Sequence, residues 1–154
     1  MRHWLMKSEP GVYSIEDLRR DGRTSWEGVR NYQARNFMRD GMNVGDLVLF
    51  YHSNAEPAGV AGLGRIVRVA YPDPFATEPG HPYFDEKAKP DTWVTVDVGF
   101  VEGWKEVVSL AELKADPALA GMEVTRRGSR LSVQPVCKEH HDRVVALGHS
   151  KGVA

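Results

Sequence analysis

Long strand-like segments dominate the pattern of this 154-residue chain, and no helical segment of similar length separates them. Residues 47–51 form an unbroken apolar run, which is typical of a strand covered on both faces. Residues 93–98 alternate apolar with polar side chains and continue as a strand to Val101. Because no strand–helix unit repeats, the sequence favours an α+β fold built on a small barrel or a strongly bent sheet over a doubly wound sheet.

Glycines and prolines indicate where the strands bend and end. The segment 59–69 is predicted to be a strand, and Gly62 and Gly64 within it indicate a bulge or the close approach of another backbone. Five of the nine prolines lie in the stretch from Tyr71 to Pro90, which predicts a long ordered loop. Loops of that length are often functional or mobile.

Short helices with recognisable caps are expected around the sheet. Ser14 and Asp17 approximate a capping box for a helix over 15–20, and Gly22 follows as a stop. Asn31 is placed to cap the next helical segment. Further helices are expected over 110–114, with Ser109 as its cap, and over 138–147, ending at Gly148. Further extended segments are expected over 3–7 and 131–136.

Composition excludes several classes of protein. A net charge of -1 argues against a protein that coats nucleic acid through bulk electrostatics, although clustered arginines allow a local basic patch. The single cysteine, Cys137, excludes an intrachain disulfide and a four-cysteine zinc site. His140 and His141 lie close to it without further ligands, so no metal is expected. With no membrane-length apolar run and no recognisable secretion signal, we expect a cytoplasmic monomer with one domain over residues 1–150 and no cofactor.

Five motifs, in one order along nearly the whole chain, resemble those of the EVE domain, a relative of the PUA, ASCH and YTH folds. They are residues 4–10 (WLMKSEP), 26–36 (WEGVRNYQARN), 45–46 with 50–53 (GD and FYHS), 59–62 (GVAG) and 127–136 (RGSRLSVQPV). The resemblance implies a PUA-like mixed β-barrel of five or six strands with short peripheral helices. It also implies a pocket for one nucleobase, since some EVE domains resemble readers of modified cytosine in DNA.

A pocket that reads one base needs an aromatic ring to stack on it and polar groups that fix its edge. The position of Trp26 resembles that of the cage tryptophan of YTH relatives, and Tyr32 and Tyr51 are further aromatic candidates. Core packing is the competing explanation for these rings, as capping and turn chemistry is for the polar candidates. The polar candidates are Lys7 and Ser8 as donors, Glu9 as an acceptor for an exocyclic amine, Asn31 as both, and His52, Ser53 and Ser132 around the same opening.

Four arginines are expected to contact phosphate groups at the rim of the pocket: Arg30, Arg35, Arg127 and Arg130. So few contacts predict weak, salt-sensitive binding unless the base pocket adds to it. The expected partner is therefore DNA or RNA that carries a modified base.

Two other functions compete with base reading. Some ASCH relatives are hydrolases that use a pocket lysine, and Lys7 beside Ser8 and Glu9 resembles such an arrangement. A small-molecule sensor without nucleic acid is the other alternative. Nucleotide hydrolysis has no support, because the glycines at 59, 62 and 64 lack the lysine and hydroxyl of a P-loop.

Overall fold

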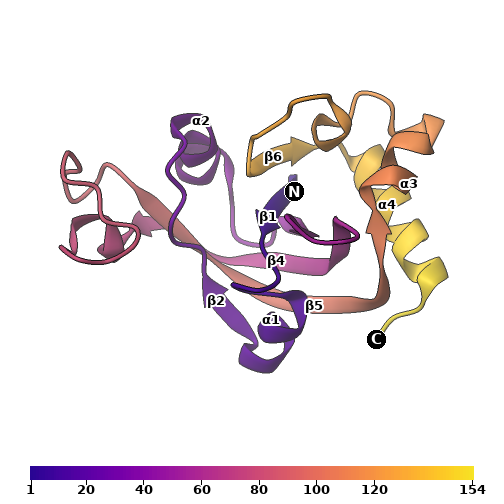
Figure 1. Ribbon diagram of the computed structural model, residues 1–154, viewed down its shortest axis with the longest axis horizontal. Coiled ribbons are helices and arrows are strands. Elements are labelled where there is room, and N and C mark those ends of the chain that lie inside the picture. The colour runs from indigo at the N-terminus through magenta and orange to yellow at the C-terminus, as the bar shows by residue number, and fades with distance from the viewer.

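The computed structural model describes residues 1–154, and a six-stranded mixed sheet forms its centre (Figure 1). The strand order is β2-β5-β4-β3-β1-β6. Their bounds are β1 (His3–Ser8), β2 (Arg23–Ser25), β3 (Leu47–His52), β4 (Gly59–Pro72), β5 (Val94–Ser109) and β6 (Val133–Val136). The α+β class and the six strands agree with the sequence, but the sheet is bent and open, with β2 and β6 at its edges, and does not close into a barrel.

Alternating side chains of the central strands divide the core into two clusters. On β1, Trp4 and Met6 face one cluster, which also holds Phe50, while Leu5 faces the other with Leu49. This is the period of two that a strand buried on both faces requires. Helix α1 (Ile15–Asp21) contributes to the first cluster and helix α4 (Lys138–Lys151) to the second, so each covers one face of the sheet.

Strands β4 and β5 pair along most of their length, and their register shifts four times. A side chain at Gly62 would place its Cβ 2.3 Å from the carbonyl oxygen of Glu102, and one at Gly64 would lie 3.0 Å from that of Gly99. The backbones therefore approach each other at the glycines, as the sequence predicted. The resulting curvature lets β5 run from the edge strand β2 at one end to the start of α3 (Leu110–Ala115) at the other (Figure 1).

The predicted caps are present, with one correction at the last helix. Ser14 with Asp17, and Ser109 with Glu112, form complete capping boxes, and Asn31 caps α2 (Tyr32–Asn36). Gly148 does not end α4; the helix continues to Lys151 and is capped by Gly152 at φ +99°, whereas Gly148 lets the helix backbone pack directly on the indole of Trp104. The other short elements are a π-helical turn (Phe37–Gly41) and the 3-10 turns Pro74–Thr77, Pro117–Leu119 and Glu123–Thr125.

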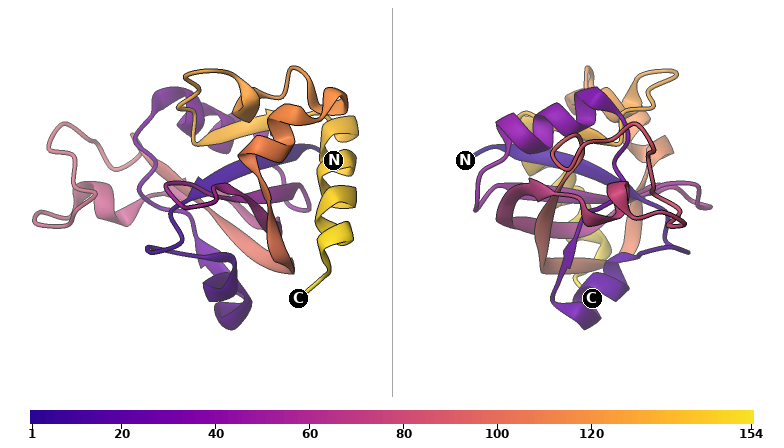
Figure 2. Two further views of the ribbon diagram at one scale, coloured as in Figure 1. Left: turned by 45° about the vertical axis from the view of Figure 1, so that its right-hand side comes forward. Right: turned by 90° about the vertical axis from the view of Figure 1, so that its left-hand side faces the viewer.

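The proline-rich segment 73–93 is an ordered excursion between β4 and β5. Figure 2 shows it projecting from the body of the molecule on the side away from α4. It contains one 3-10 turn and a series of tight turns, and Trp93 at its end is buried. No helix in the fold has both the length and the apolar composition needed to cross a membrane.

Asp46 joins the start of β3 to the start of β1. Its buried carboxylate accepts hydrogen bonds from Trp4 Nε1 (3.0 Å), from the backbone N–H of Arg2 (3.0 Å) and from that of Asn43 (2.9 Å). Burial alone would raise the pKa of Asp46, but the three donors together hold it below its usual value. The parallel pairing of β1 with β3 therefore begins at a charged anchor.

We expect Asp46→Asn to lower the free energy of unfolding by about 1–3 kcal/mol at pH 7, because an amide oxygen cannot serve all three donors. Since the pKa is lowered on folding, the stabilisation is present above the unfolded-state pKa of about 3.9 and disappears as the pH falls below it. Urea unfolding from pH 7 to pH 3 should show the gap between wild type and variant narrowing in acid. A gap that is constant with pH would contradict this role for the carboxylate.

Candidate nucleic-acid interface

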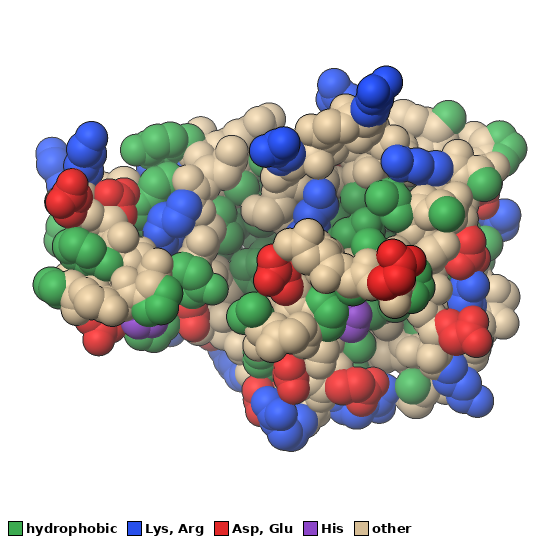
Figure 3. Space-filling model, viewed as in Figure 1, with side chains coloured by type: hydrophobic (Ala, Val, Ile, Leu, Met, Phe, Trp, Pro, Cys, Tyr) green, Lys and Arg blue, Asp and Glu red, His purple; other side chains and the backbone are tan.

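A cavity of about 620 Å³ opens where β1 ends, between the turn that follows it and the segment that leads from β2 to α2. Figure 3 shows this face of the molecule, with hydrophobic side chains at the base of a hollow. The size lies within the range of about 300–1,000 Å³ that is usual for small-ligand sites. Its lining residues are Lys7, Ser8, Glu9, Val12, Tyr13, Thr24, Ser25, Trp26, Glu27, Gly28, Val29, Arg30, Asn31, Tyr83 and Ser132.

Seven of the residues predicted from the sequence meet in this cavity, although they come from three distant parts of the chain. They are Lys7, Ser8, Glu9, Trp26, Arg30, Asn31 and Ser132. Ser132 is brought to the end of β1 because the backbone N–H of Lys7 donates to its carbonyl oxygen at 2.9 Å. Tyr32, Tyr51, His52, Ser53, Arg35, Arg127 and Arg130 do not line it.

Some polar groups of the cavity already form hydrogen bonds within the protein, and others are free to bind a ligand. The ammonium of Lys7 has no hydrogen-bond or ion-pair partner. Burial lowers its pKa, and the negative charge of Glu123 offsets only part of that shift. Asn31 Oδ1 accepts the cap bond from the N–H of Ala34 at 3.0 Å, which leaves its Nδ2 as a free donor. By contrast, Ser8 Oγ donates to the carbonyl of Tyr13 at 2.6 Å. Lys7 and Asn31 are therefore free donors.

Glu9 and the serines add acceptors at the same opening. The carboxylate of Glu9 accepts a hydrogen bond from Asn54 Nδ2 through one oxygen, Oε1. Ser25 Oγ donates to one oxygen of Glu27, Oε2, so the hydroxyl of Ser25 is not a free donor. The hydroxyl of Ser132 has no protein partner and lies free beside Lys7. The cavity thus offers both donors and acceptors to the edge of a flat polar ligand.

Two aromatic rings border the cavity from different segments. Trp26 is only 8% exposed and packs edge-on against Phe50, so it is a core residue with one edge on the cavity. Tyr83 was not predicted, because it lies in the proline-rich segment far from the other motifs. Its ring rests on the backbone of Gly28, where a Cβ would come within 2.6 Å of it, and the φ of +86° at Gly28 also favours glycine.

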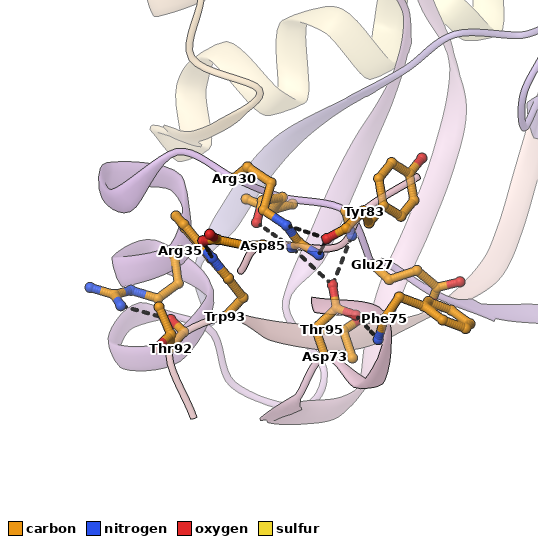
Figure 4. Close-up of polar contacts among 12 residues, drawn as sticks. Glu27, Arg30, Arg35, Asp73, Phe75, Tyr83, Asp85, Thr92, Trp93 and Thr95 are labelled. Atoms are coloured by element: carbon orange, nitrogen blue, oxygen red, sulfur yellow. Dashed lines mark hydrogen bonds and ion pairs between the residues drawn. The ribbon is translucent and has the colours of Figure 1, made fainter. Parts of the chain in front are cut away.

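A buried carboxylate joins the segment of Tyr83 to that of Trp26. Asp73 has a fully buried side chain that accepts from the backbone N–H of Gly28 (2.9 Å), from Arg30 Nη1 (3.1 Å) and from the N–H of Phe75 (2.9 Å). Arg30 in turn donates through Nη2 to the carbonyl of Tyr83 at 2.7 Å. Figure 4 shows Arg30 between Tyr83 and Trp93. An Asp-Pro pair signals the local turn, but no sequence signal connects it to Gly28.

Three predicted site residues lie on or after β3, away from the cavity lining. Tyr51 is 3% exposed in the second core cluster, and burial raises the pKa of its hydroxyl. His52 Nε2 accepts a hydrogen bond from the N–H of Ile15 at 3.1 Å, and burial lowers the pKa of its ring, so it serves as a neutral structural acceptor. Ser53 pairs through its backbone N–H with the carbonyl of Ser8.

The four predicted arginines fall into two pairs. Arg30 and Arg35 are engaged inside the protein; Arg35 donates to the carbonyl of Thr92 at 2.8 Å and to Asn36. Arg127 and Arg130 are exposed, have no protein partner, and line a second hollow of about 260 Å³. Asn31 lines both hollows, so the second adjoins the first.

Comparison with known proteins identifies the family. The family model of the EVE domain matches residues 2–147. Human thymocyte nuclear protein 1 is 46% identical over 167 residues, which cover 94% of this chain and 73% of that protein. A solved protein from Pseudomonas syringae has a TM-score of 0.91 and 48% identity, with 94% of this chain and 98% of that chain covered.

A further solved structure is that of the human THYN1 protein in complex with DNA containing 5-methylcytosine. It has a TM-score of 0.87 and 44% identity, and the match covers 96% of this chain and 98% of that chain. The PUA-like α+β fold implied by the motifs is therefore confirmed, and the chain belongs to the EVE domain family.

Proposed function

We propose that the protein binds nucleic acid by taking one modified base, such as a modified cytosine in DNA, into the 620 Å³ cavity. The observation that carries this proposal is the meeting of two aromatic rings with unpaired donors and acceptors from distant segments. The similarity to a human protein solved with DNA that contains 5-methylcytosine supports a modified cytosine as the base.

A flipped base needs a ring to stack on and partners for its polar edge, and the cavity supplies both. Tyr83 borders the cavity with its ring and Trp26 with the exposed edge of its indole, and base–aromatic stacking on one ring contributes roughly 1–3 kcal/mol. The Lys7 ammonium suits the ring acceptors of cytosine, and the free oxygen of Glu9 suits its exocyclic amine. Burial of one methyl group adds about 0.8 kcal/mol, so the preference for a methylated base is modest, roughly fourfold.

Phosphate contacts are assigned to Arg127 and Arg130, since the guanidinium groups of Arg30 and Arg35 already serve the protein. Both lie beside the cavity, joined to it by Asn31. A strand whose base enters the cavity would pass this second hollow with its backbone. The cytoplasmic location, the monomeric state and a single domain over residues 1–150 remain predictions.

We also propose that binding occurs without turnover. Burial lowers the pKa of Lys7, which favours the neutral amine, but Nζ forms no hydrogen bond or ion pair with a carboxylate that could relay a proton to a leaving group. The neighbouring Ser8 hydroxyl donates to a backbone carbonyl, so it is not activated by a base.

Lys7→Met should weaken binding to an oligonucleotide with one 5-methylcytosine by about tenfold to a hundredfold, because a charge-assisted hydrogen bond is lost. Trp26→Phe should also weaken it while preserving the core better than alanine does. Fluorescence anisotropy of labelled oligonucleotides with modified and unmodified cytosine measures both. Lys105→Met, an exposed lysine on β5 outside the cavity, is the matched control. Unchanged affinity in Lys7→Met would refute the proposed site.

Arg127→Ala and Arg130→Ala should each weaken binding equally for modified and unmodified oligonucleotides. Each should reduce the slope of log affinity against log salt by about 0.7–0.9, the value of one phosphate contact. Binding titrations at several salt concentrations between roughly 50 and 200 mM measure these slopes. Arg143→Ala removes the same charge from α4 and should leave the slope unchanged. A wild-type slope in both rim variants would exclude this phosphate path.

Long incubation with acyl-modified cytidine and with the 5-methylcytosine oligonucleotide should yield no new product by mass spectrometry. Binding of the same compounds is measured in parallel, so that a lack of product is not confused with a lack of contact. Deacylated cytidine that forms with wild type and not with Lys7→Met would establish the hydrolase instead.

A further inference from the structure

An exposed aromatic stack lies just outside the cavity, at the start of α2. Tyr32 is 59% exposed, yet its ring stacks on the buried indole of Trp93, with the centroids 4.8 Å apart and the planes inclined by 29°. The indole is fixed in turn, because Trp93 Nε1 donates to Asp85 at 2.8 Å. An exposed tyrosine is thus held flat on a rigid base.

Tyr32 is largely exposed, although Arg35 lies near its ring. The guanidinium of Arg35 lies 4.9 Å from the centroid of Tyr32 and 5.8 Å from that of Trp93, while the two rings are 4.8 Å apart. Arg35 is therefore within cation–π distance of both rings. Arg35 is itself fixed by the carbonyl of Thr92. Because Tyr32 is 59% exposed despite these contacts, its ring still offers surface to a flat ligand.

The stack is also close to the cavity. Tyr32 follows Asn31, which lines the cavity, and neighbouring Cα atoms are about 3.8 Å apart. Arg30, another lining residue, has its guanidinium 5.5 Å from the ring of Trp93. A single arginine therefore separates the cavity wall from the base of the stack.

We propose that Tyr32 is a second stacking platform, which holds the base next to the one in the cavity on the same strand. This inference rests on the proposed function and narrows its ligand. The partner must present two consecutive bases that have left their stack, as in single-stranded or locally opened nucleic acid. Since every base has a π-face, this second position tolerates any base.

The decisive variant is Tyr32→Leu, which covers Trp93 as the tyrosine does but lacks a π-face; Tyr32→Phe is its conservative partner. Tyr32→Leu should weaken binding to a single-stranded 5-methylcytosine oligonucleotide roughly 5- to 150-fold, the equivalent of one stacked base. It should leave the affinity for the free nucleoside 5-methyl-2′-deoxycytidine unchanged. Tyr32→Phe should behave as wild type, and thermal unfolding verifies that all variants are folded.

Oligonucleotides with an abasic site on either side of the 5-methylcytosine complete the test. Wild type should bind one of the two more weakly than the intact strand. Tyr32→Leu should bind that abasic strand and the intact strand with the same affinity. Lys7→Met, which should weaken both nucleoside and oligonucleotide, separates the two proposals. If Lys7→Met has that effect while Tyr32→Leu lowers neither affinity, or lowers both equally, the platform is refuted and the cavity stands. If Lys7→Met affects neither ligand, the proposed function itself fails.

Discussion

One wall of the cavity depends on the buried carboxylate of Asp73. It binds the backbone of Gly28, the guanidinium of Arg30 and the backbone of Phe75, so it joins two segments that are more than forty residues apart in the chain. The carbonyl of Tyr83 then accepts from the arginine that Asp73 orients. A charge with no exposure to water is tolerable only when it is fully paired, and this one has three donors. The projecting segment and the cavity are therefore one structural unit.

The polar groups around the cavity divide into those that maintain the fold and those left for a ligand. Arg30, Arg35 and Ser8 form hydrogen bonds within the protein, whereas the charged groups of Lys7, Arg127 and Arg130 have no hydrogen-bond or ion-pair partner. Side chains whose hydrogen bonds are complete hold the rings in place before anything binds. This arrangement favours affinity, because little ordering remains to be done on association.

Local chemistry made much of the fold predictable from the sequence. Ser14, Asn31 and Ser109 cap helices as expected, since each cap needs only residues within one turn of it. The end of α4 was misplaced at Gly148, because its contact with Trp104 is long-range. The three-residue strand β2 was missed for the same reason: it exists only through pairing with β5. Recognition of the motifs, more than periodicity, brought residues of distant segments to one site.

The amide of Asn31 has one end in the helix cap and the other at the junction of two hollows. Replacing it to alter recognition would also remove a cap that contributes about 1 kcal/mol to stability. Ser132, whose hydroxyl has no such structural duty, carries no comparable penalty. In related proteins, changes in base specificity should therefore arise by substitution at position 132, while position 31 stays an asparagine.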